Sequence, residues 1–269
     1  MVIIRSIFAY SFTIISVFAL IPFGFPAFIL SFFGLKKPMS WVIYRVVQFW
    51  ARGVIFFAGS KMTIEGRENI PKKGGICFVS NHVGVFDIVV ALAYAGRPFG
   101  FIAKKELLYF PFFNLWIHML GGLFIDRKNI RKAIKTINHG IKKIQNGYSM
   151  LIFPEGTRSR GRGLLPFRSG AIKLATQSLA PIVPMAISGS YDVFEVDYRI
   201  HPVPVRVVFC PPIITADMDP EQRRHRLADE VRAIIEAALA SSTIIIPEQE
   251  QVNPLTKTPE EPAAEPTST

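Results

Sequence analysis

The sequence has few cysteines and no acidic residue near its N-terminus. Its 269 residues include only two cysteines, Cys77 and Cys210, which form no CxxC or other metal-binding pattern. A disulfide-stabilised scaffold and a structural zinc site are therefore both unfavoured. The first acidic residue is Glu65, although six basic residues precede it and the net charge of the chain is +11. The N-terminal region is therefore purely cationic.

Charged residues are also scarce in the chain as a whole. They make up 19% of the sequence, against 50% for hydrophobic residues. This composition excludes a disordered or fibrous protein and is apolar for a freely soluble one. The positive charge is compatible with nucleic-acid binding, but the basic residues alternate with an apolar periodicity and no recognition motif is present. We therefore predict that nucleic acid is not a partner.

The N-terminus contains a long run without charge. The thirty residues between Arg5 and Lys36 are all uncharged, and as one helix they would extend ~45 Å, longer than a bilayer core of ~30 Å. Pro22 and Pro26 predict a break near the middle, which leaves a single span or a re-entrant hairpin. A signal peptide is disfavoured because its apolar region has only ~7–15 residues.

The following segment has an amphipathic pattern. Arg45, Gln48 and Arg52 form one polar stripe on an otherwise apolar and aromatic helix, which is typical of a helix near a membrane interface. We therefore predict that residues 1–60 anchor the chain to a lipid bilayer. Basic residues at both ends of the uncharged run are compatible with a hairpin whose two ends are cytoplasmic.

The pattern from residue 61 onward alternates short apolar runs with helical periodicity. Predicted strands are 75–80, 99–103, Leu123–Ile125, 148–153, 182–187 and 203–209, and predicted helices are 85–95, 129–146, 169–179 and about 220–240. This alternation indicates an α/β fold with a largely parallel or mixed sheet flanked by helices. We assign residues 61–246 to this domain. The last segment, 247–269, is rich in Pro and Glu and is predicted to be disordered.

Polar residues follow three of the predicted strands. Asn81 to Asp87 follow the first, Asp126 to Lys128 follow the third, and Pro154 to Arg160 follow the fourth. Ligands of α/β folds bind beyond the carboxyl ends of parallel strands. We therefore expect one histidine, several carboxylates and several arginines to meet at a single edge of the sheet.

His82 and Asp87 are candidates for acid–base chemistry. On one regular helix, residues five apart point about 140° away from each other, so the two side chains meet only if His82 lies in the turn before the helix. Asp87 would then orient the imidazole and leave its other nitrogen free as a base. No G-x-S-x-G motif is present, so the nucleophile would be a substrate hydroxyl. The structural alternative is a helix-capping Asp87 and a turn histidine.

The segment PEGTRSRGRG has the composition of an anion site. Gly156 exposes backbone N–H groups, Thr157 adds a hydroxyl, and Arg158 offers a two-pronged donor for phosphate. Arg127, from a neighbouring strand end, would complete the clamp, and Glu155 would hold an arginine or the loop in place. The alternative is a solvated loop that touches anionic lipid. The histidines show no zinc-ligand spacing, so we predict no metal site.

Together these residues resemble the glycerolipid acyltransferase family, and most of all the 1-acyl-sn-glycerol-3-phosphate acyltransferases. Four segments match the family's motifs in order and spacing, namely Asn81-His82-x4-Asp87, Gly122 to Arg127, Phe153 to Arg158 and Ile182 to Ala186. The resemblance covers roughly residues 62–215. One departure is Gly84, because the family often has serine there.

The resemblance implies a role for each matched residue. His82 would be the general base and Asp87 its orienting partner. The residues implied to bind substrate are Lys104, Arg127, Glu155, Gly156, Thr157, Arg158 and Pro184. Lys104 would lie near the phosphate or the developing oxyanion, and Pro184 near the acyl chain, while the other five would organise the acceptor phosphate.

The resemblance also implies an activity. An acyl group would pass from acyl-CoA or acyl-acyl-carrier protein to the sn-2 hydroxyl of lysophosphatidic acid (1-acyl-sn-glycerol-3-phosphate), giving phosphatidic acid for phospholipid synthesis. No cofactor beyond the acyl donor is implied. The expected location is the inner (cytoplasmic) membrane, with the catalytic domain facing the cytoplasm. Two alternatives stay open: another acceptor such as a lyso-ornithine lipid, and a non-catalytic membrane-tethered protein that binds anionic lipid.

Overall fold

One seven-stranded sheet organises the chain. The computed structural model describes residues 1–216 and 218–241, so the predicted disordered tail lies outside the described residues. The strands are β1 (Met62–Glu65), β2 (Cys77–Ser80), β3 (Gly100–Lys104), β4 (Leu123–Ile125), β5 (Met150–Ile152), β6 (Ile182–Ser188) and β7 (Val205–Phe209). Their order in the sheet is β1-β7-β6-β2-β5-β3-β4.

The sheet is mixed. Strands β2 to β6 are parallel to one another, β7 is antiparallel to β6, and β1 is parallel to β7. The predicted α/β fold with a largely parallel or mixed sheet is therefore confirmed. Among the strands, the sequence analysis missed β1, because its four residues alternate between half-buried and exposed side chains and form no apolar run. Among the helices, it missed α5 (Phe113–Met119).

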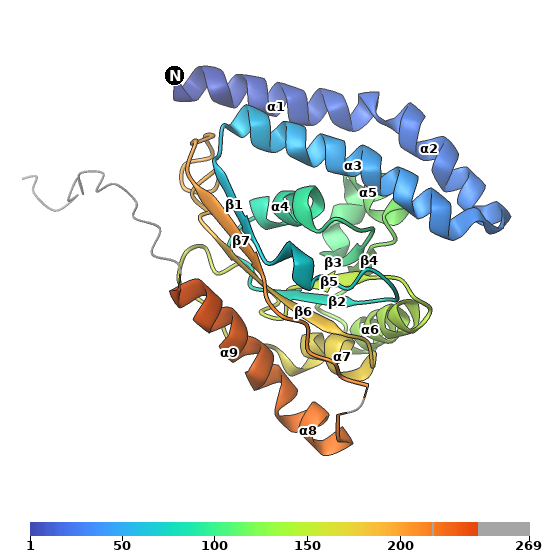
Figure 1. Ribbon diagram of the computed structural model, residues 1–269. Coiled ribbons are helices and arrows are strands. Elements are labelled where there is room, and N and C mark those ends of the chain that lie inside the picture. The colour runs from blue at the N-terminus through green and yellow to red at the C-terminus, as the bar shows by residue number, and fades with distance from the viewer. Residues whose placement is uncertain (217, 242–269) are drawn as a thin grey trace, which may run out of the picture.

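Helices cover both faces of the sheet (Figure 1). Successive strand residues point to opposite faces, so Phe78 packs into one hydrophobic cluster and Val79 into the other. The first face is covered by α4 (Phe86–Tyr94), α5 (Phe113–Met119) and a long helix from the N-terminal region. The second is covered by α6 (Ile130–Gln145), α7 (Ser169–Gln177) and α9 (Leu227–Ala240), preceded by the short α8 (Pro220–His225).

Helix α6 shows how local sequence sets the ends of an element. The Asn129 side chain accepts a hydrogen bond from the Lys132 backbone N–H at 3.0 Å and caps the N-terminus. Gly147 follows the last turn with φ 87°, a conformation that favours glycine and ends the helix. The predicted helix over residues 129–146 is confirmed.

The N-terminal region forms a helical hairpin above the sheet. It comprises α1 (Val2–Ala19), α2 (Ile21–Leu30), a short turn segment (Ser31–Leu35) and α3 (Lys36–Ala58), and α1 and α2 lie along α3 (Figure 1). The expected break occurs just before Pro22, which lies in the first turn of α2. Pro26 remains inside α2. The chain reverses direction at Gly34, whose φ is 87°.

The polar stripe of α3 contacts the α/β domain through Gln48 and Arg52, while the arginines Arg45 and Arg52 are exposed. Gln48 is 4% exposed and donates to the Ala93 carbonyl at the end of α4 at 3.0 Å. Arg52 donates to the same carbonyl at 3.4 Å, and Arg45 donates to Gln48 at 3.0 Å. Gln48 and Arg52 thus satisfy one C-terminal carbonyl of a neighbouring helix, that of Ala93, a role that depends on tertiary contacts.

The outer face of the hairpin is apolar and uncovered. Within residues 2–58 one helical stretch is long and apolar enough to cross a membrane, and only 17% of its most apolar window is buried. A core helix of a soluble protein would be mostly buried. The hairpin is nonetheless bound to the domain, since Trp116 Nε1 donates to the Val17 carbonyl at 3.0 Å and Tyr10 Oη donates to the Tyr198 carbonyl at 2.8 Å. It therefore forms an integral layer with one apolar surface exposed.

Candidate active site

The predicted polar residues converge at one edge of the sheet. Because β2 to β6 are parallel, their carboxyl ends lie at the same edge. The segments that leave this edge begin at Asn81, Lys105, Asp126, Phe153 and Gly189. The three predicted strand ends therefore do meet at one edge of the sheet, and the structure shows that β3 and β6 end at the same edge.

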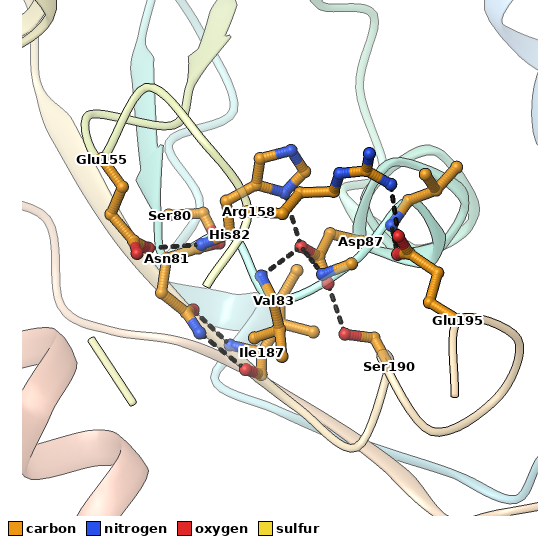
Figure 2. A network of polar contacts seen from close by, with 12 residues as sticks. Ser80, Asn81, His82, Val83, Asp87, Glu155, Arg158, Ile187, Ser190 and Glu195 are labelled. Carbon is orange, nitrogen blue, oxygen red and sulfur yellow. Dashed lines mark hydrogen bonds and ion pairs between the residues drawn. The ribbon is translucent and has the colours of Figure 1, made fainter. Parts of the chain in front are cut away.

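His82 and Asp87 are in direct contact. His82 Nδ1 lies 2.7 Å from Asp87 Oδ2 (Figure 2). His82 precedes α4, whereas Asp87 lies in its first turn, which is the arrangement that their spacing required. With an ionised Asp87, this contact places the imidazole proton on Nδ1 and leaves a lone pair on Nε2.

Asp87 is fixed by three further donors. Its Oδ2 accepts the backbone N–H groups of Val83 and Gly84 at 2.7 and 3.0 Å, and its Oδ1 accepts a hydrogen bond from Ser190 Oγ. The carboxyl side chain is fully buried. Such hydrogen bonds stabilise the charged carboxylate in place of water. Asp87 therefore holds the turn before α4 and is at the same time the partner of His82.

The imidazole of His82 is held by Asp87 at Nδ1 and by Phe153 on one ring face. Its ring stacks on Phe153 with a centroid distance of 4.0 Å and an interplanar angle of 19°. Its side chain is 17% exposed and lines a cavity of about 440 Å³. Nε2 has no hydrogen-bond partner within residues 1–216 and 218–241. The ring is thus immobilised with one nitrogen available to a ligand.

Glu155 organises the loops around His82. It is 2% exposed, and its carboxylate accepts the backbone N–H of His82 at 2.6 Å and that of Leu165 at 3.0 Å. Burial raises the pKa of Glu155, while these two N–H groups act in the opposite direction. Of the two expected roles, holding an arginine or holding the loop, the structure shows the second.

Asn81 fixes the end of β2 against β6. Its amide oxygen accepts the Ile187 backbone N–H and its amide nitrogen donates to the Ile187 carbonyl, both at 2.8 Å. The Ser159 backbone N–H donates to the His82 carbonyl at 2.7 Å and so binds the loop after β5 to the backbone at His82. The backbone that carries His82 is therefore bound to the strands on either side.

The cavity beside His82 is cationic at one end. Its lining includes Lys104, Arg127, Gly156, Thr157 and Arg158. Arg127 donates to the Gly156 carbonyl, and partial desolvation together with the neighbouring Arg168 lowers its pKa. Lys104 is exposed and only loosely paired with Glu106, at 3.7 Å. This arrangement of cations and backbone donors is suited to binding an anion.

Arg158 is already paired. Its guanidinium forms an ion pair with Glu195, whose carboxylate also accepts the Val85 N–H (Figure 2). A Cβ at Gly84 would lie 2.6 Å from Glu195 Oε2, so the glycine that departs from the family pattern leaves room for this carboxylate. An anion that binds Arg158 must therefore compete with Glu195.

A second, wholly apolar cavity adjoins the first. It has a volume of about 380 Å³ and shares Val85, Ile88, Phe101 and Leu107 with the cationic cavity. Its other walls come from the N-terminal hairpin and α5, for example Val17, Leu20 and Trp116. The hairpin therefore forms part of the wall of a cavity next to that of His82, and this apolar space is suited to a hydrocarbon chain.

Two predicted binding residues are not in the cavity wall. Glu155 acts through backbone contacts, and Pro184 lies inside β6 opposite Val79, buried within the sheet. Pro184, which the resemblance places near the acyl chain, lies on the strand next to β2, and its proximity to an acyl chain stays a prediction. No group of three or more His, Cys, Asp or Glu side chains that could hold a metal occurs in the part of the chain that the structure describes.

Three contacts at the site were missed in the sequence analysis. The first two are made by Ser190 and Glu195, which follow β6, and the third is the stacking of His82 on Phe153, a residue that had been named only as part of a motif. The only signal for the first two is that SGSYDVFE directly follows a buried strand at the same edge of the sheet. Reading β6 as a fourth strand end with polar residues would have found them.

Comparisons with known proteins agree with this geometry. The family model described as Acyltransferase matches residues 61–188. A 1-acyl-sn-glycerol-3-phosphate acyltransferase of Escherichia coli (strain K12) is 36% identical over 178 residues, which cover 66% of this chain and 72% of that protein. Another protein of that name, from Borreliella burgdorferi, is 35% identical over 140 residues, 52% of this chain. The chain matches 56% of its length and 58% of that of a Limnanthes douglasii relative.

A solved structure shares the fold. The crystal structure of the 1-acyl-sn-glycerophosphate (LPA) acyltransferase PlsC from Thermotoga maritima superposes with a TM-score of 0.73, covering 90% of this chain and 97% of that one at 24% identity. The chain therefore belongs to the glycerolipid acyltransferase family, together with these 1-acyl-sn-glycerol-3-phosphate acyltransferases.

Proposed function

We propose that this protein transfers a fatty acyl group from acyl-CoA or acyl-acyl-carrier protein to the sn-2 hydroxyl of 1-acyl-sn-glycerol-3-phosphate, producing phosphatidic acid for phospholipid synthesis. The carrying observation is that His82, held by Asp87, lines a cavity that also has cations in its wall and that adjoins an apolar cavity. An acceptor with a phosphate and a donor with a hydrocarbon chain both fit this combination.

The reaction follows from the free nitrogen of His82. Nε2 takes the proton of the acceptor hydroxyl as its oxygen attacks the thioester carbonyl. The tetrahedral intermediate then collapses, the C–S bond breaks, and the imidazolium returns the proton to the leaving thiolate. Asp87 stabilises the imidazolium without itself taking a proton. Beyond the acyl donor itself, this sequence of steps uses no cofactor.

The cations orient the acceptor in this proposal. Lys104, Arg127 and Arg158 would bind the phosphate, with Gly156 and Thr157 adding polar contacts from the same loop. Glu155 acts as a positioning residue through the His82 backbone. The apolar cavity would take an acyl chain, which supports a lipid substrate rather than a small soluble one.

The exposed apolar surface suggests where the enzyme works. Large apolar side chains are exposed along the hairpin, for example Ile7 at 59% and Phe33 at 77%, and Tyr109 and Phe110 are exposed near the cavity. A contiguous apolar surface of this kind marks a membrane-binding face. The proposed location is the inner (cytoplasmic) membrane, with the hairpin in the lipid and the catalytic domain on the cytoplasmic side.

One assay tests the proposed reaction. Membranes containing the protein are given a labelled acyl thioester and a panel of lysolipids with and without a phosphate monoester. The expected product is phosphatidic acid from 1-acyl-sn-glycerol-3-phosphate. Product only from another acceptor would refute the substrate assignment, and no thioester consumption at all would favour a binding protein.

A second acceptor class is favoured by one observation. Arg158 is neutralised by Glu195, so part of the cationic clamp is occupied before any ligand arrives. This arrangement would suit a lysolipid without a phosphate monoester, such as a lyso-ornithine lipid, acylated by the same His82 chemistry.

Replacing Arg158 by alanine separates the two acceptor classes. We expect Arg158→Ala to raise KM about tenfold for phosphate-bearing acceptors, since a charge-assisted hydrogen bond is removed, and to change neutral acceptors much less. Steady-state kinetics on paired acceptors measure this difference. Arg160→Ala is the matched control, because Arg160 is exposed in the same loop and does not line the cavity.

The Arg158→Ala change leaves Glu195 without its ion-pair partner, and a double variant tests the effect of that charge. If Arg158→Ala/Glu195→Gln recovers normal KM for phosphate acceptors, the single-variant defect came from repulsion by Glu195 rather than from a lost phosphate contact. Equal losses on both acceptor classes would show that Arg158 only supports the loop.

Ser190 is predicted to act as a positioning residue. It donates to Asp87 Oδ1 and does not line the cavity. We expect Ser190→Ala to lower kcat about tenfold with KM nearly unchanged, because a hydrogen bond to a buried charge contributes ~1.5–3 kcal/mol. Ser190→Thr, which keeps the hydroxyl, should retain most of kcat. A fall in thermal stability without a change in kcat would contradict this role.

A further inference from the structure

A third cavity lies at the opposite edge of the sheet. It has a volume of about 540 Å³ and is bordered by residues that precede β2, β3, β4 and β5, such as Gly74, Pro98, Gly121 and Ser149. It is therefore at the amino ends of the strands that carry His82 at their carboxyl ends. It shares no lining residue with the cationic cavity beside His82, so the acceptor and thioester sites do not account for it.

The lining of this cavity is cationic without any carboxylate. Its five cations are Lys36, Lys37, Lys72, Arg97 and Lys143. None of them forms an ion pair with a carboxylate of the described residues. His118 and His139 also line it. Like charges gathered around one cavity repel each other, and an anion in the cavity would relieve that repulsion.

Two of the cations are held in place by the protein backbone. Lys143 donates to the Gly121 carbonyl, and Arg97 donates to the carbonyls of Pro71 and Gly74. Arg97 Nε is buried and has no hydrogen-bond partner in the described part of the chain. Burial lowers the pKa of both side chains, and no carboxylate offsets it. The charges are thus preorganised for an anionic ligand rather than neutralised within the fold.

The remaining wall identifies the kind of anion. Phe28, Phe32 and Trp41 come from the reversing end of the helical hairpin, and Phe32 and Trp41 are 66% and 43% exposed. Figure 1 shows this end of the hairpin on the same side of the molecule as α6. A small soluble anion would gain nothing from these aromatic side chains. Tryptophan and lysine side by side are typical of the level of lipid headgroups.

We propose that this cavity, lined by Lys36, Lys37, Lys72, Arg97 and Lys143, binds the phosphate of an anionic membrane phospholipid, whose glycerol and chains lie against Phe32 and Trp41. Basic pockets beside membrane helices bind headgroups in this way. The bound lipid fixes the hairpin tip to the membrane surface from the end of the domain opposite His82. The site is independent of the transfer reaction and of the acceptor assignment.

The test follows lipid binding through Trp41. The full chain is placed in phosphatidylcholine nanodiscs that contain increasing fractions of phosphatidylglycerol with brominated chains, and tryptophan quenching is measured. Trp41→Phe identifies the part of the signal that comes from this cavity. Saturable quenching of Trp41 by phosphatidylglycerol, without equal quenching by brominated phosphatidylcholine, is the expected result.

Matched charge variants decide whether the cavity or the overall charge is responsible. Lys36→Gln/Lys37→Gln/Lys72→Gln should raise the half-saturating lipid fraction at least about tenfold, given the usual contribution of each lysine near a membrane. The control Lys132→Gln/Lys135→Gln/Lys142→Gln removes the same charge from exposed positions of α6 that do not line the cavity, and should change it less than about twofold. Equal effects of the two variants would overturn the proposal.

Two further arms cover other sources of failure. Lys143→Gln lies on the domain side and leaves the hairpin unaltered, and it should weaken phosphatidylglycerol binding about fivefold. Unchanged binding in this variant would place the lipid outside the cavity.

Inorganic phosphate is added to the nanodiscs that contain phosphatidylglycerol, as the soluble alternative. If it displaces phosphatidylglycerol from Trp41 at low concentration, the site takes a soluble phosphate and the lipid assignment is wrong.

Discussion

Replacing His82 by alanine is expected to lower kcat for acyl transfer by ~10²–10⁴-fold, the usual contribution of a general base. The reason is that Nδ1 of His82 is bound to Asp87, which leaves Nε2 as the ring nitrogen that is free at the cavity. No other group of the pair can take the hydroxyl proton. The measurement is the rate of labelled acyl transfer by the purified variant in lipid, with folding checked by circular dichroism and thermal unfolding.

A second histidine–carboxylate pair provides the control. His201 Nε2 lies 2.9 Å from Asp197 Oδ1, and neither residue lines the cavity. His201→Ala removes an imidazole from a similar pair and should leave kcat nearly unchanged. Substantial residual activity of a well-folded His82→Ala protein would refute the assignment of the base.

Replacing Asp87 by asparagine is expected to have a comparably large effect while preserving shape. In Asp87→Asn, the amide oxygen of the new side chain can still accept the N–H groups of Val83 and Gly84, to which Asp87 Oδ2 is now bound. A neutral amide, however, does not stabilise an imidazolium. The same oxygen would still accept His82 Nδ1–H, because Asp87 Oδ2 also lies 2.7 Å from Nδ1, so the expected loss comes from the missing negative charge and not from a change of tautomer. We expect kcat to fall about 10²–10⁴-fold, as for aspartates that orient a catalytic histidine.

This prediction has its own discriminating measurement. The thermal unfolding temperature of Asp87→Asn should fall by only a few degrees, because the hydrogen bonds from the Val83 and Gly84 N–H groups are retained. KM should change little, since Asp87 does not line the cavity. If activity is lost only in proportion to unfolded protein, Asp87 only holds the turn before α4 and is not the partner of a base.

Much of the catalytic arrangement could be anticipated from local sequence. The five-residue spacing of His82 and Asp87 required a turn followed by a helix, and the structure has that order. The apolar runs of β2, β5 and β6 are buried on both faces of the sheet and are therefore visible as continuous hydrophobic segments. The strand ends that carry Asn81 and Phe153 followed directly from these runs.

Other features depended on which strands become neighbours. Ser190 reaches Asp87 only because β6 pairs with β2, across more than one hundred residues of sequence. The pairing of Arg158 with Glu195 likewise joins the ends of two different strands. No periodicity reports such contacts, since sheet order is set by long-range packing.

The helical hairpin shows the same division. Its apolar character and the break before Pro22 are properties of the local chain. The side that faces the domain could not be predicted from the local sequence. A cationic stripe is equally compatible with lipid headgroups and with helix carbonyls. Gln48 and Arg52 bind a helix carbonyl because α4 ends beside them.

The sequence by itself determined the α/β class, the apolar N-terminal layer, and the residues His82 and Asp87, because each is expressed in hydrophobic period or short-range spacing. Only the tertiary structure decided that Glu195 pairs with Arg158, that Ser190 reaches Asp87, and that five cations from separate segments surround a cavity at the opposite edge. These outcomes depend on contacts between segments far apart in the chain, and such contacts leave no local pattern to read.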